Sequence, residues 1–285
     1  RSWLWRRQCL WGYKNQNAEH RPPRGTRTTV SQCPLRLGHM HPVTLCHDDR
    51  RIRLAQERHR RSPGRRPVDH PAGADNLCVR ALVALRDLVR PRSGADVRLR
   101  KRIPSGAGLG GGSGDAAAVL AGLNRFWRAG LTISRLRTLA LSLGSDVPFF
   151  LAGGAAVGRG RGERLSPLPS RLRAWAVVLK PRFGVSTRAA YAALDRMAER
   201  NRGCPGATLA GVSRALRRGR LDELRTHNDF EAALATPHPD LARLRTELLR
   251  AGAAPVFLTG SGSALIGLCA DRRRAGRVAR ALGCP

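Results

Sequence analysis

The stretch from Pro104 to Asp115 reads PSGAGLGGGSGD, and six of its 12 residues are glycine. Glycine adopts positive φ angles and lets backbone N–H groups approach an anion closely. The residues that follow predict a helix, and the amino end of a helix carries about half a positive charge. A flexible linker is the alternative, but a linker would not lie between a strand and a strongly amphipathic helix. The stretch therefore predicts a phosphate-binding loop.

Two common phosphate-binding motifs do not match this loop. No Gly-Lys-Ser/Thr sequence closes it, so it is not a Walker A motif. It is also not a Rossmann fingerprint followed by an acidic residue on a second strand. Ser113 supplies a hydroxyl that could reach a phosphate or Mg²⁺, or cap the following helix. Asp115 falls in the first helical turn, where a carboxylate favours the helix dipole, so we interpret it as partly structural.

A carboxylate farther along the chain is the candidate general base. Asp146 follows a predicted helix, in the sequence GSDVP, and we expect no regular helix beyond Val147 because a proline comes next. A carboxylate here could orient an acceptor hydroxyl and take its proton during phosphoryl transfer. The alternative is an aspartate that caps a helix or a turn.

Helices and strands must hold these residues in place. An Asp-Asn pair caps a predicted helix over residues 77–88, with Leu77, Ala81, Leu85 and Leu88 on its apolar face. We further predict strands at 97–100, 175–179, 256–258 and 264–268, and helices at 116–127, 134–143, 187–199, 209–217, 239–251 and 272–282. This mixture predicts an α+β chain.

Composition limits the class of protein. The 285 residues are enough for one large domain or two small ones. We find no membrane span and no signal peptide, and we therefore expect a cytoplasmic protein. The net charge of +32 would suit a nucleic-acid binder, but the arginines are scattered and we interpret most of the charge as background. The seven cysteines include no CxxC pair, which favours free thiols over disulfides or a zinc site.

Residues 1–73 differ from the rest of the chain. They hold 16 Lys+Arg against 5 Asp+Glu, with Pro, Arg and His throughout. Apolar periodicity is hard to find apart from a short stretch near Val43–Cys46, so we predict disorder or a segment translated from a shifted reading frame. Six of the eight histidines fall here, in spacings that match no metal-ligand pattern. The predicted domains are 1–73, 74–165 and 166–285.

The motifs after residue 74 resemble those of the GHMP kinases. IPSGAGLGGGSGDAA is similar to the second motif of that superfamily. It is most similar to the loop of the family that phosphorylates 4-diphosphocytidyl-2-C-methyl-D-erythritol, with Gly114 in place of a usual serine. Further matches follow the order of that family: 75–77 (DNL), 143–154 (LGSDVPFFLAGG), 160–163 (GRGE), 180–187 (KP then VST), 228–231 (NDFE) and 259–263 (TGSGS).

This resemblance implies a two-lobed GHMP kinase fold and an ATP-dependent reaction. The γ-phosphoryl group of ATP would pass to the 2-hydroxyl of 4-diphosphocytidyl-2-C-methyl-D-erythritol, in the non-mevalonate route to isoprenoids, with Asp146 as the catalytic base. Mg²⁺ is implied by the chemistry, with Ser113 as its candidate ligand. The implied ATP-binding residues are Pro104, Gly106, Ala107, Gly108, Leu109, Gly110, Gly111, Gly112, Ser113, Gly114 and Asp115, with Asn76 and Lys101 on the adenine side. For Asn76 and Lys101 the alternative is that they are polar surface residues.

The resemblance also implies a substrate site. Thr187 and Tyr191 are four residues apart at a helix start, and the tyrosine ring suits stacking on cytosine. The resemblance places both in the cytidine pocket, and it places Gly260, Ser261 and Gly262 beside the substrate phosphates. The alternatives are a core tyrosine and a plain hairpin turn.

Two opening segments of the family, PAKINL and R-x-DGYH, have no counterpart before residue 74. We therefore expect an unrelated or disordered segment in place of the amino-terminal strands of the first lobe. The alternatives are another GHMP kinase acting on homoserine, a sugar or a mevalonate derivative, an inactive fragment of the family, or a basic nucleic-acid-binding protein. On the kinase reading, the partners are ATP and a cytidine-diphosphate-linked sugar alcohol, without membrane or nucleic acid, and the chain is a monomer or homodimer.

Overall fold

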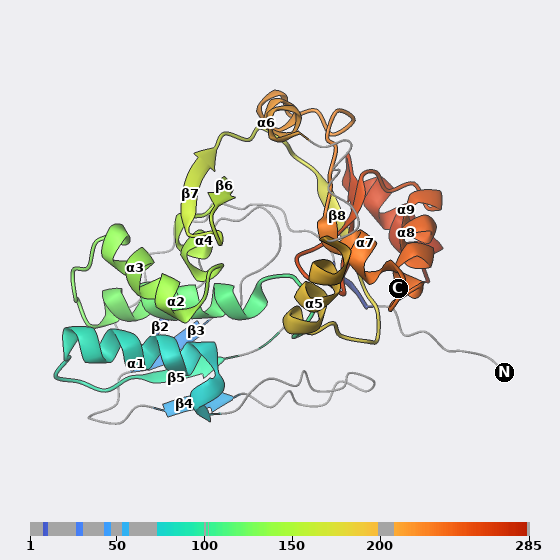
Figure 1. Cartoon of the computed structure of the whole chain (residues 1–285). Coiled ribbons are helices and arrows are strands. Elements are labelled where there is room, and N and C mark those ends of the chain that lie inside the picture. Colours follow the sequence, from blue (N-terminus) through green and yellow to red (C-terminus); the bar gives the residue numbers. More distant parts are fainter. Residues whose placement is uncertain are drawn as a thin grey trace. The chain divides into compact units, whose positions relative to one another are not determined.

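The computed structural model describes residues 8–10, 27–30, 43–46, 53–56, 73–99, 101, 103–198 and 208–283. The chain divides into two compact units, drawn in Figure 1. The amino-terminal unit comprises residues 14–105 and 110–167, and the carboxy-terminal unit comprises residues 1–13, 106–109 and 168–285. The glycine-rich stretch is therefore shared, because its residues 106–109 belong to the carboxy-terminal unit.

The amino-terminal unit packs helices on a four-stranded sheet with the strand order β2-β3-β5-β4. Strands β2, β3 and β5 pair antiparallel, and β4 pairs parallel to β5. Strands β6 and β7 form a separate two-stranded sheet. The elements are β2 (Arg27–Val30), β3 (Val43–Cys46), β4 (Arg53–Gln56), η1 (Gly73–Asp75), α1 (Leu77–Val89), β5 (Asp96–Leu99), α2 (Gly111–Phe126), α3 (Ile133–Leu143), α4 (Val147–Ala152), β6 (Ala155–Arg159) and β7 (Arg164–Leu168).

Helices α1 and α2 lie side by side and supply most of the core of this unit (Figure 1). The predicted apolar face of α1 needs one correction, because Leu88 is 55% exposed while Cys78 and Leu82 are buried. The buried positions thus follow the i, i+3, i+4, i+7 spacing of a helix that packs on one side. Helix α2 is more deeply enclosed, and every residue from Gly114 to Leu120 is buried.

Strands from the first 73 residues take part in the β2-β3-β5-β4 sheet and in the four-stranded sheet of the carboxy-terminal unit. The apolar stretch noted in the sequence, Val43–Cys46, forms β3. Three strands that we did not predict, β1, β2 and β4, are three or four residues long, too short for alternation to be read. Backbone pairing with longer neighbours is enough to hold such strands. The prediction of disorder for the rest of this segment concerns residues outside the described part of the chain.

The carboxy-terminal unit contains a second four-stranded sheet, with the strand order β1-β8-β10-β9 and antiparallel pairing throughout. Its main core joins this sheet to α8 and α9. The elements are β1 (Gln8–Leu10), β8 (Trp175–Lys180), α5 (Thr187–Ala198), α6 (Leu209–Arg218), α7 (Asp229–Ala235), α8 (Asp240–Arg250), β9 (Val256–Leu258), β10 (Leu265–Cys269) and α9 (Arg272–Ala281).

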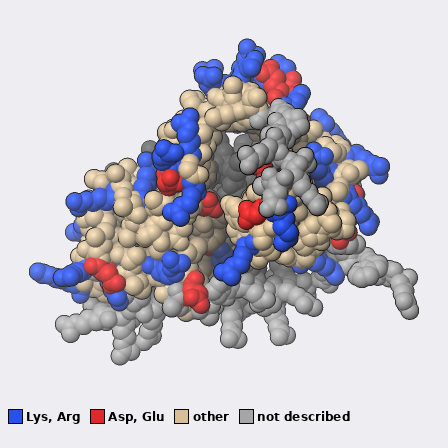
Figure 2. Space-filling model, in the orientation of Figure 1, with Lys and Arg blue, Asp and Glu red and all other residues tan. Residues whose placement is uncertain are grey.

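The predicted α+β class is confirmed, and all the helices and strands predicted after residue 74 are present within a few residues. Glu199, the predicted end of the helix at 187, lies outside the described residues. We did not predict α4, α7, β6 or β7. Figure 2 shows lysine and arginine side chains spread over the visible face rather than gathered in one patch. Among the described residues, no helix is both long and apolar enough to cross a membrane.

Candidate active site

The second half of the predicted phosphate loop is the amino end of α2. Gly110 is the N-cap residue, and its φ of 65° is a left-handed conformation that glycine adopts without strain. The helix begins at Gly111, so residues 111–114, which we predicted as loop, form its first turn. Asp115, which we expected in the first turn, is the fifth residue of the helix and begins its second turn. Gly110 has no side chain to cap this turn. The first N–H groups and the positive end of the helix dipole therefore remain for an anion.

Glycine lets neighbouring side chains approach this turn closely. A Cβ atom on Gly110 would lie 2.5 Å from the ring of Phe150, and one on Gly111 would lie 3.1 Å from Ile103. Phe150 belongs to α4, which packs against α2. Larger residues at these two positions would push the turn away from its supports, so the glycines fix its position as well as its conformation.

The first half of the loop packs against the Gly-Ser-Gly turn of the carboxy-terminal unit. The N–H of Ala264 donates to the carbonyl of Ala107 at 3.1 Å, and the hydroxyl of Thr259 donates to the carbonyl of Gly108 at 3.0 Å. A Cβ atom on Gly108 would collide with the carbonyl oxygen of Thr259. Residues 106–109 and 259–263 therefore meet backbone to backbone, which brings together two motifs that we predicted separately.

A buried ion pair lies beside the first turn of α2. The ammonium of Lys101 donates to the carboxylate of Asp115, and the two side chains are 8% and 2% exposed. The nearby Asn76 caps α1 by accepting a hydrogen bond from the N–H of Cys78 at 2.9 Å. The pKa of the Cys78 thiol is raised to about 12, mainly by burial and in part by the Asp115 carboxylate, while Lys101 acts in the opposite direction. The adenine contacts of Asn76 and Lys101 remain predictions.

Asp146 occupies the N-cap position of α4, but its side chain makes no capping hydrogen bond. Our expectation that no regular helix extends beyond Val147 was wrong, since α4 runs to Ala152. Pro148 falls in the first turn, where a helix needs no N–H from that residue. The Asp146 carboxylate is exposed. It is therefore open to a ligand, as a base requires.

Two of the predicted substrate residues come together in the carboxy-terminal unit. The hydroxyls of Thr187, the first residue of α5, and Ser261 are 3.2 Å apart. Tyr191 is 54% exposed, so it is not the core residue that we considered as an alternative. Its ring packs edge-on against Phe230, with the centroids 5.0 Å apart. An exposed ring held by a second ring is suited to stacking on a base.

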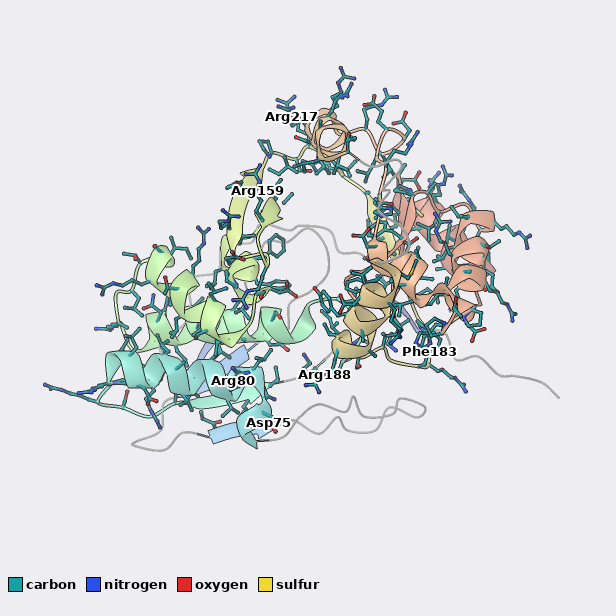
Figure 3. The ribbon with its side chains drawn as sticks, in the orientation of Figure 1. Asp75, Arg80, Arg159, Phe183, Arg188 and Arg217 are labelled. Atoms are coloured by element: carbon teal, nitrogen blue, oxygen red, sulfur yellow. The ribbon has the colours of Figure 1, made fainter. Side chains whose placement is uncertain are left out.

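Three groups that we had not singled out as functional hold the segment before Thr187. The carbonyl of Phe183, labelled in Figure 3, accepts hydrogen bonds from the Lys180 ammonium at 2.6 Å and from the Ser263 hydroxyl at 2.7 Å. Lys180 also donates to the carbonyl of Pro181 at 2.7 Å, and its burial lowers its pKa. The Phe183 ring stacks on His238, with the ring centroids 4.8 Å apart. The sequence signal for this support was Lys180, a charged residue at the end of the apolar strand β8.

The motif at 228–231 has a similar supporting role. The side-chain amide of Asn228 donates to the carbonyls of Leu258 at 2.8 Å and Gly260 at 2.9 Å, while its oxygen caps α7. The carboxylate of Glu231 accepts from the N–H of Leu258 at 2.7 Å. These bonds tie α7 to β9 and to the turn that carries Ser261.

Comparison with known proteins is consistent across sequence and structure. The model of the GHMP kinases N terminal domain matches residues 76–154, and the GHMP kinases C terminal model matches residues 212–284. A 4-diphosphocytidyl-2-C-methyl-D-erythritol kinase of Solibacter usitatus is 45% identical over 218 residues, which cover 74% of this chain and 67% of the relative. The protein of the same name from Pelotomaculum thermopropionicum is 41% identical over 219 residues, covering 74% and 73%.

Solved structures agree with this relationship. A crystal structure of a 4-(cytidine 5'-diphospho)-2C-methyl-D-erythritol kinase is 34% identical, with a TM-score of 0.68, and the match covers 85% of this chain and 84% of that one. A homoserine kinase from Cytophaga hutchinsonii shares the fold at 19% identity, with a TM-score of 0.64 and coverage of 90% and 83%. The chain therefore belongs to the GHMP kinases, and within them to the 4-diphosphocytidyl-2-C-methyl-D-erythritol kinase family.

Proposed function

We propose that the chain transfers the γ-phosphoryl group of ATP to the 2-hydroxyl of 4-diphosphocytidyl-2-C-methyl-D-erythritol, giving the 2-phosphate and ADP. The observation that carries the proposal is the 45% identity over 218 residues to a relative with that substrate in its name. Homoserine and mevalonate kinases share the fold at only 19% and 16% identity. The cytidyl substrate is therefore favoured over those of the other GHMP kinases.

In the proposed step, the oxygen of the substrate hydroxyl attacks the γ-phosphorus. The bond from the γ-phosphorus to the oxygen that bridges the β- and γ-phosphates breaks, and ADP leaves with that electron pair. Asp146 takes the proton of the attacking hydroxyl. This role is supported by a carboxylate that is exposed and makes no capping bond, although it occupies an N-cap position.

The phosphates of ATP are assigned to the glycine-rich stretch. The backbone N–H groups of Gly111, Gly112 and Ser113 lie in the uncapped first turn of α2, where the helix dipole favours negative charge. Residues 104–110 complete the predicted phosphate loop. Gly114, which replaces a usual serine of the family, leaves Ser113 as the hydroxyl of this turn.

Mg²⁺ is the cofactor that we propose beside ATP. The described residues hold no group of three or more His, Cys, Asp or Glu side chains that could bind a metal by itself. Mg²⁺ commonly takes one or two protein ligands, several waters and phosphate oxygens. The half-buried hydroxyl of Ser113 would hold the ion together with the ATP phosphates. When bound, Mg²⁺ neutralises charge on the transferring phosphoryl group.

The cytidine is assigned to the carboxy-terminal unit. The exposed ring of Tyr191 offers a stacking face, and the paired hydroxyls of Thr187 and Ser261 offer hydrogen bonds. Gly260 and Gly262 flank Ser261 at positive φ angles of 53° and 85°. Gly260 is exposed and Gly262 is buried, so Gly260 and Ser261 offer the backbone that the substrate phosphates would approach. Oligomeric state and a cytoplasmic location remain predictions.

The test is a substrate panel with purified protein, ATP and Mg²⁺. We expect ADP release with the cytidyl substrate and none above background with homoserine or mevalonate. Asp146→Asn should lower kcat about 10²- to 10⁴-fold without changing thermal stability. Asp222→Asn, at an exposed aspartate of the other unit, is the matched control. Turnover of homoserine in place of the cytidyl substrate would refute the proposal.

A further inference from the structure

The ion pair between Lys101 and Asp115 joins two segments that the sequence separates. Lys101 lies two residues beyond the end of β5, and Asp115 is the fifth residue of α2. The Lys101 ammonium donates to Oδ2 of Asp115. The pair therefore connects the exit of a central strand to the start of the second turn of α2, directly after the turn assigned to the ATP phosphates.

Both members of this pair are withdrawn from solvent. Their side chains are 8% and 2% exposed. Placing two charges in such surroundings is costly unless each neutralises the other in good geometry. A side chain that is already bonded to a carboxylate and has so little free surface is poorly placed to bind a nucleotide as well. Its contacts are those of a support.

The backbone of the first turn rests on the same strand exit. A Cβ atom on Gly111 would lie 3.1 Å from Ile103 and 3.6 Å from the ammonium nitrogen of Lys101. Lys101 is therefore a close neighbour of Gly111, where the uncapped N–H groups begin. The thiol of Cys78 stays protonated in these surroundings, because its pKa is raised to about 12, and so it does not compete with Asp115 for the lysine.

We infer that Lys101 and Asp115 are positioning residues, whose ion pair fixes the start of α2 to the exit of β5 and so places the phosphate-binding backbone without touching the nucleotide, in place of the adenine contact that the resemblance implied for Lys101. This inference rests on the proposed function only in assigning the ATP phosphates to that turn. It predicts that nucleotide binding and turnover require the two residues to be both charged or both apolar, and that neither charge is needed by itself.

The experiment compares Lys101→Met, Asp115→Leu and the double variant. Affinity for a non-hydrolysable ATP analogue is measured by calorimetry, and KM and kcat by ADP release. Each single variant should lower turnover on the order of 100-fold, the loss that small misplacements of reacting groups produce, with the cytidyl KM unchanged. The double variant replaces the pair by apolar side chains of similar size and should recover most of the analogue affinity and turnover.

Arg86→Met with Asp87→Leu is the control, because that ion pair is 44% and 59% exposed in the same unit. It should leave analogue affinity and turnover unchanged. A double variant that melts like the wild type but binds the analogue as weakly as Lys101→Met would overturn the inference, because Lys101 would then contact ATP. A wild-type chain that binds the analogue but does not phosphorylate the cytidyl substrate would instead refute the proposed function and leave the inference standing.

Discussion

Lys101 of the amino-terminal unit and Lys180 of the carboxy-terminal unit support neighbouring backbone in different ways. The ammonium of Lys101 is buried against a carboxylate, so one charge neutralises another. The ammonium of Lys180 is half-buried and bonds two carbonyls, which are neutral, and its pKa is lowered by burial. Removing either member of the first pair should lower the free energy of unfolding, because the other charge stays buried. In the second arrangement, burial penalises mainly the charge of Lys180.

The contrast separates two ways of fixing a binding element. At α2 the support is a pair of opposite charges, and removing one member takes the ion-pair partner from the charge that stays buried. In the segment after β8 the support is a shared acceptor, the carbonyl of Phe183, which keeps the hydroxyl of Ser263 when Lys180 is lost. Loss of Lys101 should therefore destabilise the amino-terminal unit strongly and locally, whereas loss of Lys180 should destabilise the carboxy-terminal unit only in part.

The largest expected effect is the loss of stability caused by Lys101→Met. We expect the free energy of unfolding to fall by about 3–5 kcal/mol, because the Asp115 carboxylate loses its charged partner while it stays buried. Urea denaturation measures this loss. Arg86→Met, which breaks an exposed pair, should cost within about 1 kcal/mol. Equal losses in the two variants would remove the contrast between buried and exposed pairs.

The second effect is the smaller loss of stability caused by Lys180→Met. We expect a loss of about 1.5–3 kcal/mol for two hydrogen bonds from a charged donor, with one acceptor still bonded to Ser263. KM for the cytidyl substrate should rise, since the segment leads to Thr187, while affinity for the ATP analogue should not change. Arg217→Met, at an exposed position of α6 (Figure 3), is the control. A weaker affinity of Lys180→Met for the ATP analogue would show that the Lys180 hydrogen bonds and the Lys101–Asp115 ion pair do not act separately.

The third effect uses one buried thiol in each unit. Cys78 and Cys269 are 2% and 1% exposed, and burial raises the pKa of both. With a pKa of about 12, the thiolate fraction of Cys78 at pH 8 is on the order of one in ten thousand. Alkylation mapped by mass spectrometry should therefore be slow at both sites. Lys101→Met should speed it at Cys78 alone, and Lys180→Met at Cys269, whose strand pairs with β8. Uniform acceleration in either variant would indicate global rather than local opening.

The smallest effect is a dependence on pH. The pKa of Lys180 in the folded chain lies below its ordinary value of 10.5, so the folded state binds this proton more weakly than the unfolded state does. Stability therefore rises with pH between the folded pKa and 10.5. The difference in unfolding free energy between wild type and Lys180→Met should grow from pH 8 toward pH 10. A constant difference would mean that burial does not penalise this charge.

Local patterns in the sequence were enough to predict most helices and strands after residue 74 and the glycine-rich stretch itself. They were not enough to show that this stretch is divided, because the break depends on the left-handed conformation of Gly110 and on packing against Phe150. Helix α4 was missed because a proline reads as a helix breaker unless its place in the first turn is known.

The candidate site was predictable as a set of residues but not as a set of contacts. Lys101 and Asp115 are 14 residues apart and meet only in the folded unit. The same holds for Thr187 and Ser261, which are 74 residues apart. For Asn76, the sequence predicted both a cap of the following helix and an adenine contact. The structure shows the capping bond, and the adenine contact stays a prediction. Tertiary contacts of this kind leave no periodic trace.

Gly106 and Gly108 look interchangeable in the sequence, but their surroundings make their mutational tolerance very different. Both have positive φ angles, of 66° and 72°. A side chain at 106 would meet no protein atom within 4 Å, so the fold itself would accept asparagine, which visits this conformation readily, and only a bound nucleotide would oppose it. At 108 even a methyl group would displace the carbonyl of Thr259. Among descendants of this chain, position 108 should stay closed to change for as long as the two loops remain packed together.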